Sequence, residues 1–138
     1  MHLSTKTGYA LRALAMLART ADEKPISIAT ICKTQNLPPK YIEHLFRKLK
    51  QNNIIKSVQG AFGGYLLNKS KEEISLKDIM QAVEEDYSYK YCDGHQQKPE
   101  FCSGFPCEFY ALWDEINNNI EKYLETFTLD MIVKRIGE

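Results

Sequence analysis

The sequence predicts a mainly α-helical protein with one small β-hairpin and a long C-terminal helix. Between residues 26 and 50, a short apolar helix, a turn marked by prolines and a basic helix follow one another. A glycine-rich loop between two β-prone runs comes next, and an apolar stripe at helical spacing lies near the C-terminus. The 138 residues suit one compact unit with an added dimerisation element.

Residues 26–50 have the pattern of two helices joined by a turn. Ser27 is a capping residue type and precedes an apolar run of about two helical turns. Asn36-Leu37-Pro38-Pro39 ends this run, because proline disfavours the helical conformation in the residue before it. In the second helix, one face is apolar and the other is mostly basic. The apolar residues are Tyr41, Ile42, Leu45, Phe46 and Leu49, and the basic ones are Lys40, His44, Arg47, Lys48 and Lys50.

A hairpin is expected directly after these helices. Residues 54–58 and 65–67 are β-prone, and the loop between them contains Gly60, Gly63 and Gly64, which can adopt positive φ angles. Two helices, a turn and such a hairpin together predict a winged helix-turn-helix, a fold that binds DNA.

The charge distribution favours the same partner, although the whole chain is neutral. Residues 1–70 contain 11 Lys and Arg against 3 Asp and Glu, a difference of +8. Residues 71–138 contain 7 against 15, a difference of −8. The first half is therefore the half expected to bind a polyanion.

Helices are also predicted on both sides of this region. One is expected from Ser4 or Thr5 to about Arg19, and another begins at the capping-box-like Ser75-Leu76-Lys77-Asp78. From residue 106 a helix of roughly 20 residues is predicted, with more apolar surface than one small domain needs. The domain organisation we expect is a winged helix-turn-helix DNA-binding domain over residues 1–86, a cysteine-bearing sensor loop over 87–108, and a dimerisation helix with a C-terminal helix over 109–138.

The composition excludes several classes of protein. No stretch approaches the roughly 20 apolar residues of a membrane span, and Lys6, Arg12 and Arg19 interrupt the first apolar run, unlike a secretory signal. We therefore expect a cytoplasmic protein without a membrane partner, whose four cysteines are thiols or metal ligands rather than disulfides. The histidines and cysteines form no nucleophile pair, and no phosphate-binding loop is present, so no enzymatic activity is expected.

Three segments of the chain carry a family resemblance. They are Leu3-Ser4-Thr5-Lys6 with Tyr9-Ala10-Leu11-Arg12, the helix Tyr41-Ile42-Glu43-His44-Leu45-Phe46-Arg47-Lys48-Leu49, and the loop Val58-Gln59-Gly60-Ala61-Phe62-Gly63-Gly64-Tyr65. In this order they resemble the IscR, NsrR and CymR family of bacterial regulators, and the match spans nearly the whole chain. The resemblance implies a homodimeric transcriptional regulator, usually a repressor, which binds a pseudo-palindromic site in double-stranded DNA.

The same resemblance implies an iron-sulfur cluster held by cysteines. Carried onto this chain, the ligands would be Cys92, Cys102 and Cys107, and a 2Fe-2S cluster is expected in preference to a 4Fe-4S cluster. The fourth ligand departs from the family pattern, because Phe109 and Tyr110 stand where IscR-like proteins place a histidine. Gly8 and Arg12 stand where other relatives recruit an acidic residue or a histidine. By its chemistry, His95 is the best remaining candidate, followed by Asp93, Glu100 and Glu108.

The expected DNA contacts lie on the second helix, on the wing and at the start of the chain. Gln59 replaces an arginine of many relatives, which implies weaker electrostatic capture by the wing. Cys32, on the apolar side of the helix that follows Ser27, is expected to be a buried residue without a further role. The predicted contacts are Ser4, Lys6, Lys40, Tyr41, His44, Arg47, Lys48, Ser57, Gln59, Gly60, Gly63 and Gly64.

Two alternatives remain open at this point. One is a cluster-free regulator of the CymR type, controlled by thiol oxidation or by a protein partner on the acidic half. The other is a small redox protein that binds no DNA and has a basic face for other reasons. The function we expect is the cluster-sensing regulator, with the CymR-type regulator as its alternative and the redox protein after it.

Overall fold

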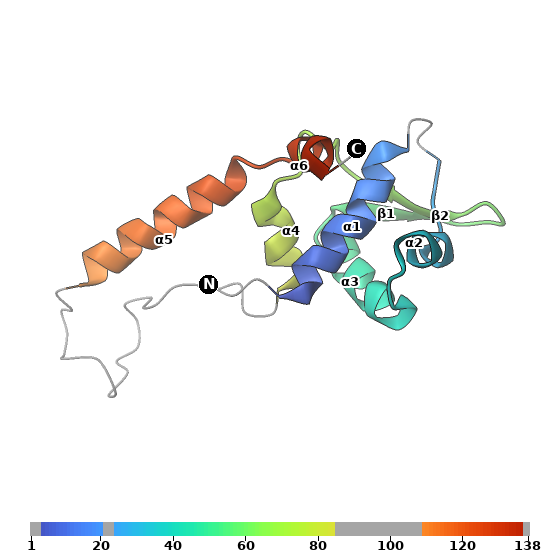
Figure 1. Cartoon of the computed structure of the whole chain (residues 1–138), viewed down its shortest axis with the longest axis horizontal. Coiled ribbons are helices and arrows are strands. Elements are labelled where there is room, and N and C mark those ends of the chain that lie inside the picture. The colour runs from blue at the N-terminus through green and yellow to red at the C-terminus, as the bar shows by residue number, and fades with distance from the viewer. Residues whose placement is uncertain (1–3, 21–23, 85–108, 137–138) are drawn as a thin grey trace.

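The computed structural model describes residues 4–20, 24–84 and 109–136, and in these residues the helices and the hairpin follow the predicted order (Figure 1). Sequence and structure agree on the winged helix-turn-helix class. The elements are α1 Thr5–Arg19, α2 Ile28–Gln35, α3 Pro39–Gln51, β1 Ile55–Val58, β2 Gly64–Leu67, α4 Leu76–Val83, α5 Tyr110–Glu125 and α6 Leu129–Ile136.

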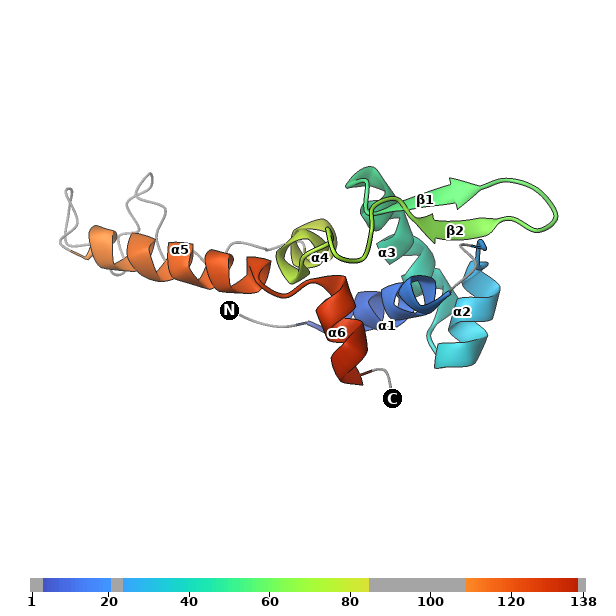
Figure 2. The same ribbon diagram turned by 90° about the horizontal axis from the view of Figure 1, so that it is seen from above.

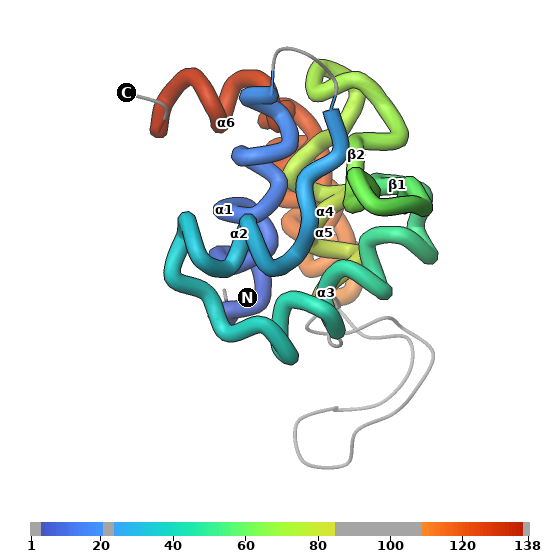
Figure 3. The backbone as a smooth tube through the Cα atoms, turned by 90° about the vertical axis from the view of Figure 1, so that its right-hand side faces the viewer, coloured from blue at the N-terminus to red at the C-terminus, as the bar shows by residue number. Residues whose placement is uncertain are grey.

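Helix α1 is the element around which the domain packs. It contacts α2, α3, α4, α6 and β2, and Figure 3 shows it surrounded by these elements. Ala10, Ala13 and Leu14 on this helix are completely buried. Alanine favours the helix and its small side chain allows neighbouring backbones to approach, so one helix can serve as the common surface for five elements.

The turn between α2 and α3 depends on Asn36. This residue caps α2 in the left-handed conformation, with φ of 53°, which asparagine tolerates better than most residues. The reversal directs Leu37 into the core, where its amide donates to the Cys32 carbonyl at 3.0 Å. Pro39 then occupies the first turn of α3, where its missing amide hydrogen is not needed.

The two strands form an antiparallel hairpin whose base contacts the helical domain. Ile55 pairs with Leu67 and Val58 pairs with Gly64, so the connecting loop is formed by residues 59–63. Strand β1 packs on α3 and strand β2 on α1. The hairpin and α5 project at opposite ends of the molecule (Figures 1 and 2).

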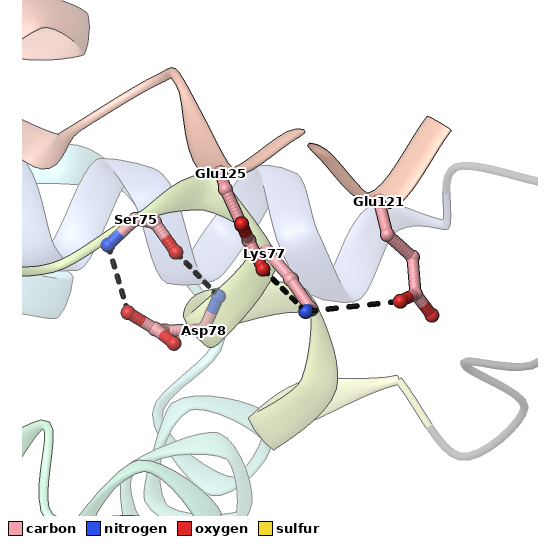
Figure 4. A network of polar contacts seen from close by, with 5 residues as sticks. All are labelled: Ser75, Lys77, Asp78, Glu121 and Glu125. Atoms are coloured by element: carbon pink, nitrogen blue, oxygen red, sulfur yellow. Dashed lines mark hydrogen bonds and ion pairs between the residues drawn. The ribbon is translucent and has the colours of Figure 1, made fainter. Parts of the chain in front are cut away.

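Helix α4 connects the basic N-terminal half of the chain to the C-terminal helices. A complete capping box starts it, because the Ser75 hydroxyl accepts from the Asp78 amide and Asp78 accepts from the Ser75 amide, both at 3.0 Å. An antiparallel bridge between Ser75 and Thr128 attaches the start of α6 beside it. From α4, Lys77 reaches across to α5 and lies 2.6 Å from Glu125 (Figure 4).

Helix α5 leaves the body of the domain with much of its apolar surface exposed. Leu124 is buried where the helix meets the domain. Farther out, the exposed large apolar side chains at the start and along the helix are Phe109, Tyr110, Leu112, Ile116 and Tyr123. In the described part of the chain, no helix is both long enough and apolar enough to cross a membrane.

Candidate DNA interface

The outward face of α3 is built from exposed polar side chains. Lys40, His44 and Arg47 are exposed, together with Glu43, whereas Ile42, Leu45, Phe46 and Leu49 are completely buried. The amphipathic pattern of the sequence therefore places the basic residues where the solvent, or a ligand, can reach them. An α-helix with this face exposed has the dimensions that fit a DNA major groove.

Two of the predicted contacts on α3 are partly covered by the protein itself. Tyr41 is half-buried, and its ring meets the ring of Tyr9 edge-to-face, with the ring centroids 5.5 Å apart. Lys48 is also half-buried. Tyr41 thus links α3 to α1, and only its remaining exposed part is available to a ligand.

Tyr65 fixes the wing beside α3. Its amide donates to the carbonyl of Ile26 at 2.9 Å, and its carbonyl accepts from the Ile26 amide at 3.1 Å. Its ring packs edge-to-face on Phe46 of α3, with the centroids 5.0 Å apart. One residue therefore joins the hairpin to the segment before α2 and to the core side of α3.

Glycine is required at two positions of the wing. At Gly64, with φ of +155°, a Cβ atom would lie 2.5 Å from the backbone of Ile26, so the bridge needs a residue without a side chain. At Gly63 a Cβ atom would lie 2.2 Å from the carbonyl oxygen of Val58. These glycines shape the loop, Gln59 and Gly60 stand exposed on it, and Ser57 on β1 is half-buried.

The start of α1 is bound to the end of α4 through one carboxylate. The hydroxyl groups of Ser4 and Thr7 both donate to Oε1 of Glu84, each at 2.6 Å. Burial opposes the ionisation of Glu84, but these two donors and the charge of Lys6 outweigh it and lower the pKa of the carboxyl group. The Ser4 hydroxyl hydrogen is thus already donated to Glu84. The predicted phosphate contacts of Ser4 and Lys6 stay predictions.

Cys32 is a core residue, as the sequence analysis expects. Only 5% of its surface is exposed, and it belongs to the hydrophobic core between α2 and α3. Burial, with a smaller contribution from the charge of Glu43, raises the pKa of its thiol. A protonated, buried thiol is a poor metal ligand and a poor nucleophile.

The predicted cluster ligands lie outside the described residues. These are Cys92, Cys102, Cys107 and His95, with Asp93, Glu100 and Glu108 as further candidates. Within residues 4–20, 24–84 and 109–136, no three His, Cys, Asp or Glu side chains come together as a possible metal site. Residues 85–108 follow Glu84 directly in the sequence.

Sequence reasoning missed two features of this region. Glu84 is separated from Ser4 and Thr7 by most of the domain, so no local pattern indicates their contact. Phe62, by contrast, stands in the sequence between Ala61 and two glycines, which could have marked it as an aromatic residue at a loop tip.

Comparison with known proteins gives consistent results. Residues 3–135 match the Rrf2 family model, described as an iron-dependent transcriptional regulator. The transcriptional regulator IscR of Pectobacterium carotovorum is 35% identical over 134 residues, which cover 96% of this chain and 79% of that protein. IscR of Escherichia coli O1:K1 is 32% identical over 133 residues, covering 96% and 80%.

Two solved structures share the fold over almost the whole chain. The first is IscR of T. potens, with a TM-score of 0.71 and 27% identity, covering 99% of this chain and 88% of that one. The second is CymR, the global cysteine regulator of B. subtilis, with a TM-score of 0.75 and 27% identity, covering 98% of both chains.

The contact at Glu84 makes a prediction about stability and pH. A lowered folded-state pKa stabilises the protein above the unfolded pKa of the group, and this contribution disappears as the pH falls through the folded pKa. Glu84→Gln should therefore cost on the order of 1 kcal/mol at neutral pH, allowing for solvent screening, because the charge-assisted bonds become neutral ones. The difference from wild type should begin to shrink below the ordinary glutamate value of 4.5 and should vanish once the pH lies below the lowered folded-state pKa of Glu84.

Urea denaturation at a series of pH values measures this difference. Glu73→Gln is the matched control, because the Glu73 side chain is exposed and should change stability little at any pH. A Glu84→Gln penalty that does not depend on pH would contradict a role for the Glu84 charge.

Proposed function

We propose that this chain, which belongs to the Rrf2 family of transcriptional regulators, is a dimeric repressor that reads DNA through α3 and the wing. The observation that carries the proposal is the exposed basic face of α3, held beside a glycine-shaped hairpin by Tyr65. The excess of basic residues in the first 70 positions supports it, since non-specific affinity for DNA comes from phosphate contacts. A protein that binds bacterial DNA must work in the cytoplasm, so we propose that this protein is cytoplasmic.

We assign two kinds of contact to this surface. Lys40, His44 and Arg47 are placed to reach base edges or phosphates of the major groove, and Arg47 can bind guanine through two hydrogen bonds. Lys48, Ser57 and Lys6 suit phosphates beside the groove. Two recognition helices are then required for a pseudo-palindromic site, with half-sites about one helical turn, roughly 34 Å, apart.

Replacing Arg47 and Lys48 by alanine tests the DNA interface. If both side chains contact phosphates, the slope of log affinity against log salt should decrease by about 2, and affinity should fall at low salt. The probe is a duplex that the wild-type protein selects from a random-sequence pool, and fluorescence anisotropy gives the affinity.

Arg19→Ala is the matched control for this experiment. Arg19 is exposed in the last turn of α1, at the end of the domain away from α3 (Figure 3), and its loss should leave the salt slope unchanged. If Arg47 and Lys48 can be removed without loss of affinity, α3 is not the reading element.

The dimer is proposed from the exposed apolar side chains of α5. Leu112, Ile116 and Tyr123 lie along a helix that projects from the domain, and a helix with a broad apolar stripe is stable in water when that stripe is covered. A second copy of α5 is the natural cover, because an isologous contact brings two α3 helices together with two-fold symmetry.

Ile116→Asp should convert the dimer to a monomer, because it places a charge in the proposed apolar interface. Sedimentation velocity measures the change. Asn118→Asp, an exposed position on the same helix that gains the same charge but lies about half a turn around the helix from Ile116, should remain dimeric. A wild-type protein that is monomeric at all concentrations, or an Ile116→Asp variant that stays dimeric, would exclude α5 as the interface.

We further propose that residues 87–108 bind an iron-sulfur cluster through Cys92, Cys102 and Cys107, with His95 as the fourth ligand. The donor chemistry fits, since thiolates and imidazole are the protein ligands of such clusters. When bound, the cluster would supply a centre that responds to oxidants or to iron supply. The description of the matching family as iron-dependent supports this proposal.

The chain can transmit such a signal through contacts next to the proposed sensor. Glu84, three residues before this segment, holds the start of α1, and Lys77, about two helix turns before Glu84, binds α5 through Glu125 (Figure 4). A change in residues 87–108 that moves the end of α4 would therefore shift α5 relative to α3. Displacement by a few ångströms is enough to lose base contacts in one half-site.

A cluster-free regulator is the second candidate, and the similarity to CymR of B. subtilis favours it specifically. In that case the same three cysteines would respond as thiols, or a protein partner would bind the acidic half of the chain. DNA binding through α3 would be common to both mechanisms.

Purification without oxygen separates the two mechanisms. A cluster protein should be coloured and contain iron and sulfide, and it should lose both in Cys92→Ser, Cys102→Ser or Cys107→Ser. The matched control is Cys32→Ala, which should retain the colour because Cys32 is buried in the core. Protein that remains colourless and free of iron after reconstitution would exclude the cluster and leave thiol or partner control.

A further inference from the structure

Phe62 is an aromatic side chain exposed at the tip of the wing. Its side chain is 93% exposed, and the next most exposed large apolar residue in the described part of the chain, Tyr123, is 65% exposed. Burying a phenylalanine side chain normally stabilises a folded protein, and the free protein does not gain this stabilisation from Phe62. The proposed dimer surface on α5 does not account for Phe62, because the hairpin lies at the opposite end of the molecule (Figures 1 and 2).

A defined turn holds Phe62 at this tip. The amide of Gly63 donates to the carbonyl of Gly60 at 3.1 Å, so Ala61 and Phe62 are the two central residues of a four-residue turn. Gly60 has φ of +117°, and Gly63 has no space for a Cβ atom beside the Val58 carbonyl. The phenyl ring is thus presented outward by backbone geometry that the glycines impose.

The base of the wing fixes where this ring stands relative to α3. Tyr65 is bonded to Ile26 and packs on Phe46 of α3. Tyr65 is three positions after Phe62 in the sequence, which is at most about 10 Å of chain. When α3 occupies a major groove, a hairpin fixed this close to it reaches the neighbouring minor groove, since the two grooves alternate along B-DNA and are about 12 Å and 6 Å wide.

The chemistry of the tip suits a minor groove. Residues 58–64 contain no charged side chain, so the tip contributes shape and apolar contact rather than charge. Positive charge is carried instead by Lys56, farther down the hairpin on β1, and by Lys24, which lines the same groove on the protein as Phe62. An apolar tip with lysines behind it complements a groove whose floor is formed by base edges and whose rims are phosphates.

We propose that Phe62 is an apolar wedge that enters the minor groove next to the major-groove site of α3 and partly unstacks one base step. The inference rests on the proposed reading of DNA by α3 and the wing, and it adds a residue that determines specificity. Unstacking costs least at flexible pyrimidine–purine steps and where no guanine amino group fills the groove. Phe62 therefore selects such a step without forming a hydrogen bond to it.

The test compares Phe62→Ala with Phe62→Leu, which keeps an apolar wedge, and with Ala61→Ser as a control for changes at the tip. The probe is the duplex selected from a random pool by the wild-type protein. Phe62→Ala should weaken binding by about tenfold, equivalent to one lost base or groove contact of about 1–3 kcal/mol, while Phe62→Leu and Ala61→Ser bind nearly as wild type. Circular dichroism and thermal melting should be unchanged, because Phe62 is exposed.

Two modified duplexes show whether the contact is in the minor groove. Diaminopurine in place of adenine adds an amino group to the minor groove and leaves the major groove unchanged. It should therefore weaken DNA binding by the wild-type protein but not DNA binding by Phe62→Ala. 2-Aminopurine at the contacted step carries the same minor-groove amino group, so its fluorescence is measured at saturating protein. It should brighten with wild type, because its stacking is lost, and should stay quenched with Phe62→Ala.

The outcomes separate this inference from the proposed function. If the wild-type protein selects and binds a duplex but Phe62→Ala binds it equally well, the wedge is excluded and DNA reading by α3 stands. Weaker binding by Phe62→Ala without any effect of diaminopurine or any 2-aminopurine signal also excludes the wedge. A wild-type protein that selects no duplex overturns the proposed function together with the wedge.

Discussion

The contact of Tyr65 with Ile26 and Phe46 is the constraint on which the proposed DNA-reading surface depends. Two backbone hydrogen bonds tie the hairpin to the segment before α2, and the aromatic contact ties it to α3. The bridge requires a glycine at position 64, because any side chain there would collide with the backbone of Ile26. Wing and helix are therefore one unit, because the base of the hairpin keeps a fixed position on α3.

Much of this arrangement follows from local sequence, and the exceptions have physical reasons. Residue types at Ser27, at Pro38 and Pro39 and at Ser75 were enough to predict where α2, α3 and α4 begin, because capping and proline effects act within one turn. The pattern of α3 predicted its buried and exposed faces. The contact of Glu84 with Ser4 and Thr7 could not be predicted in this way, because it joins residues that only tertiary packing brings together. The fully exposed state of Phe62 likewise depends on the turn geometry at Gly60 and Gly63.

Helix α4 lies between the proposed sensor segment and the proposed DNA-reading surface. Its first turn is bonded to α5 through Lys77, and the residue that caps its C-terminus, Glu84, is bonded to the start of α1. The proposed ligands at residues 92–107 follow this helix directly in the chain. The resemblance to cluster-binding regulators and the similarity to CymR agree on DNA binding and differ in the chemistry of the cysteines. The same mechanical path through α4 serves a cluster and free thiols equally well.

Dimethyl sulfate footprinting of the wild-type protein on its selected duplex tests the reading of DNA by α3 and the wing most directly, because the reagent methylates guanine in the major groove and adenine in the minor groove. The expected result is protected guanines in two blocks, with centres about one helical turn, roughly 34 Å, apart, and protected adenines beside each block. A complex that protects no bases, or protects a single block without minor-groove protection beside it, would contradict a dimer that reads one groove with α3 and the next with the wing.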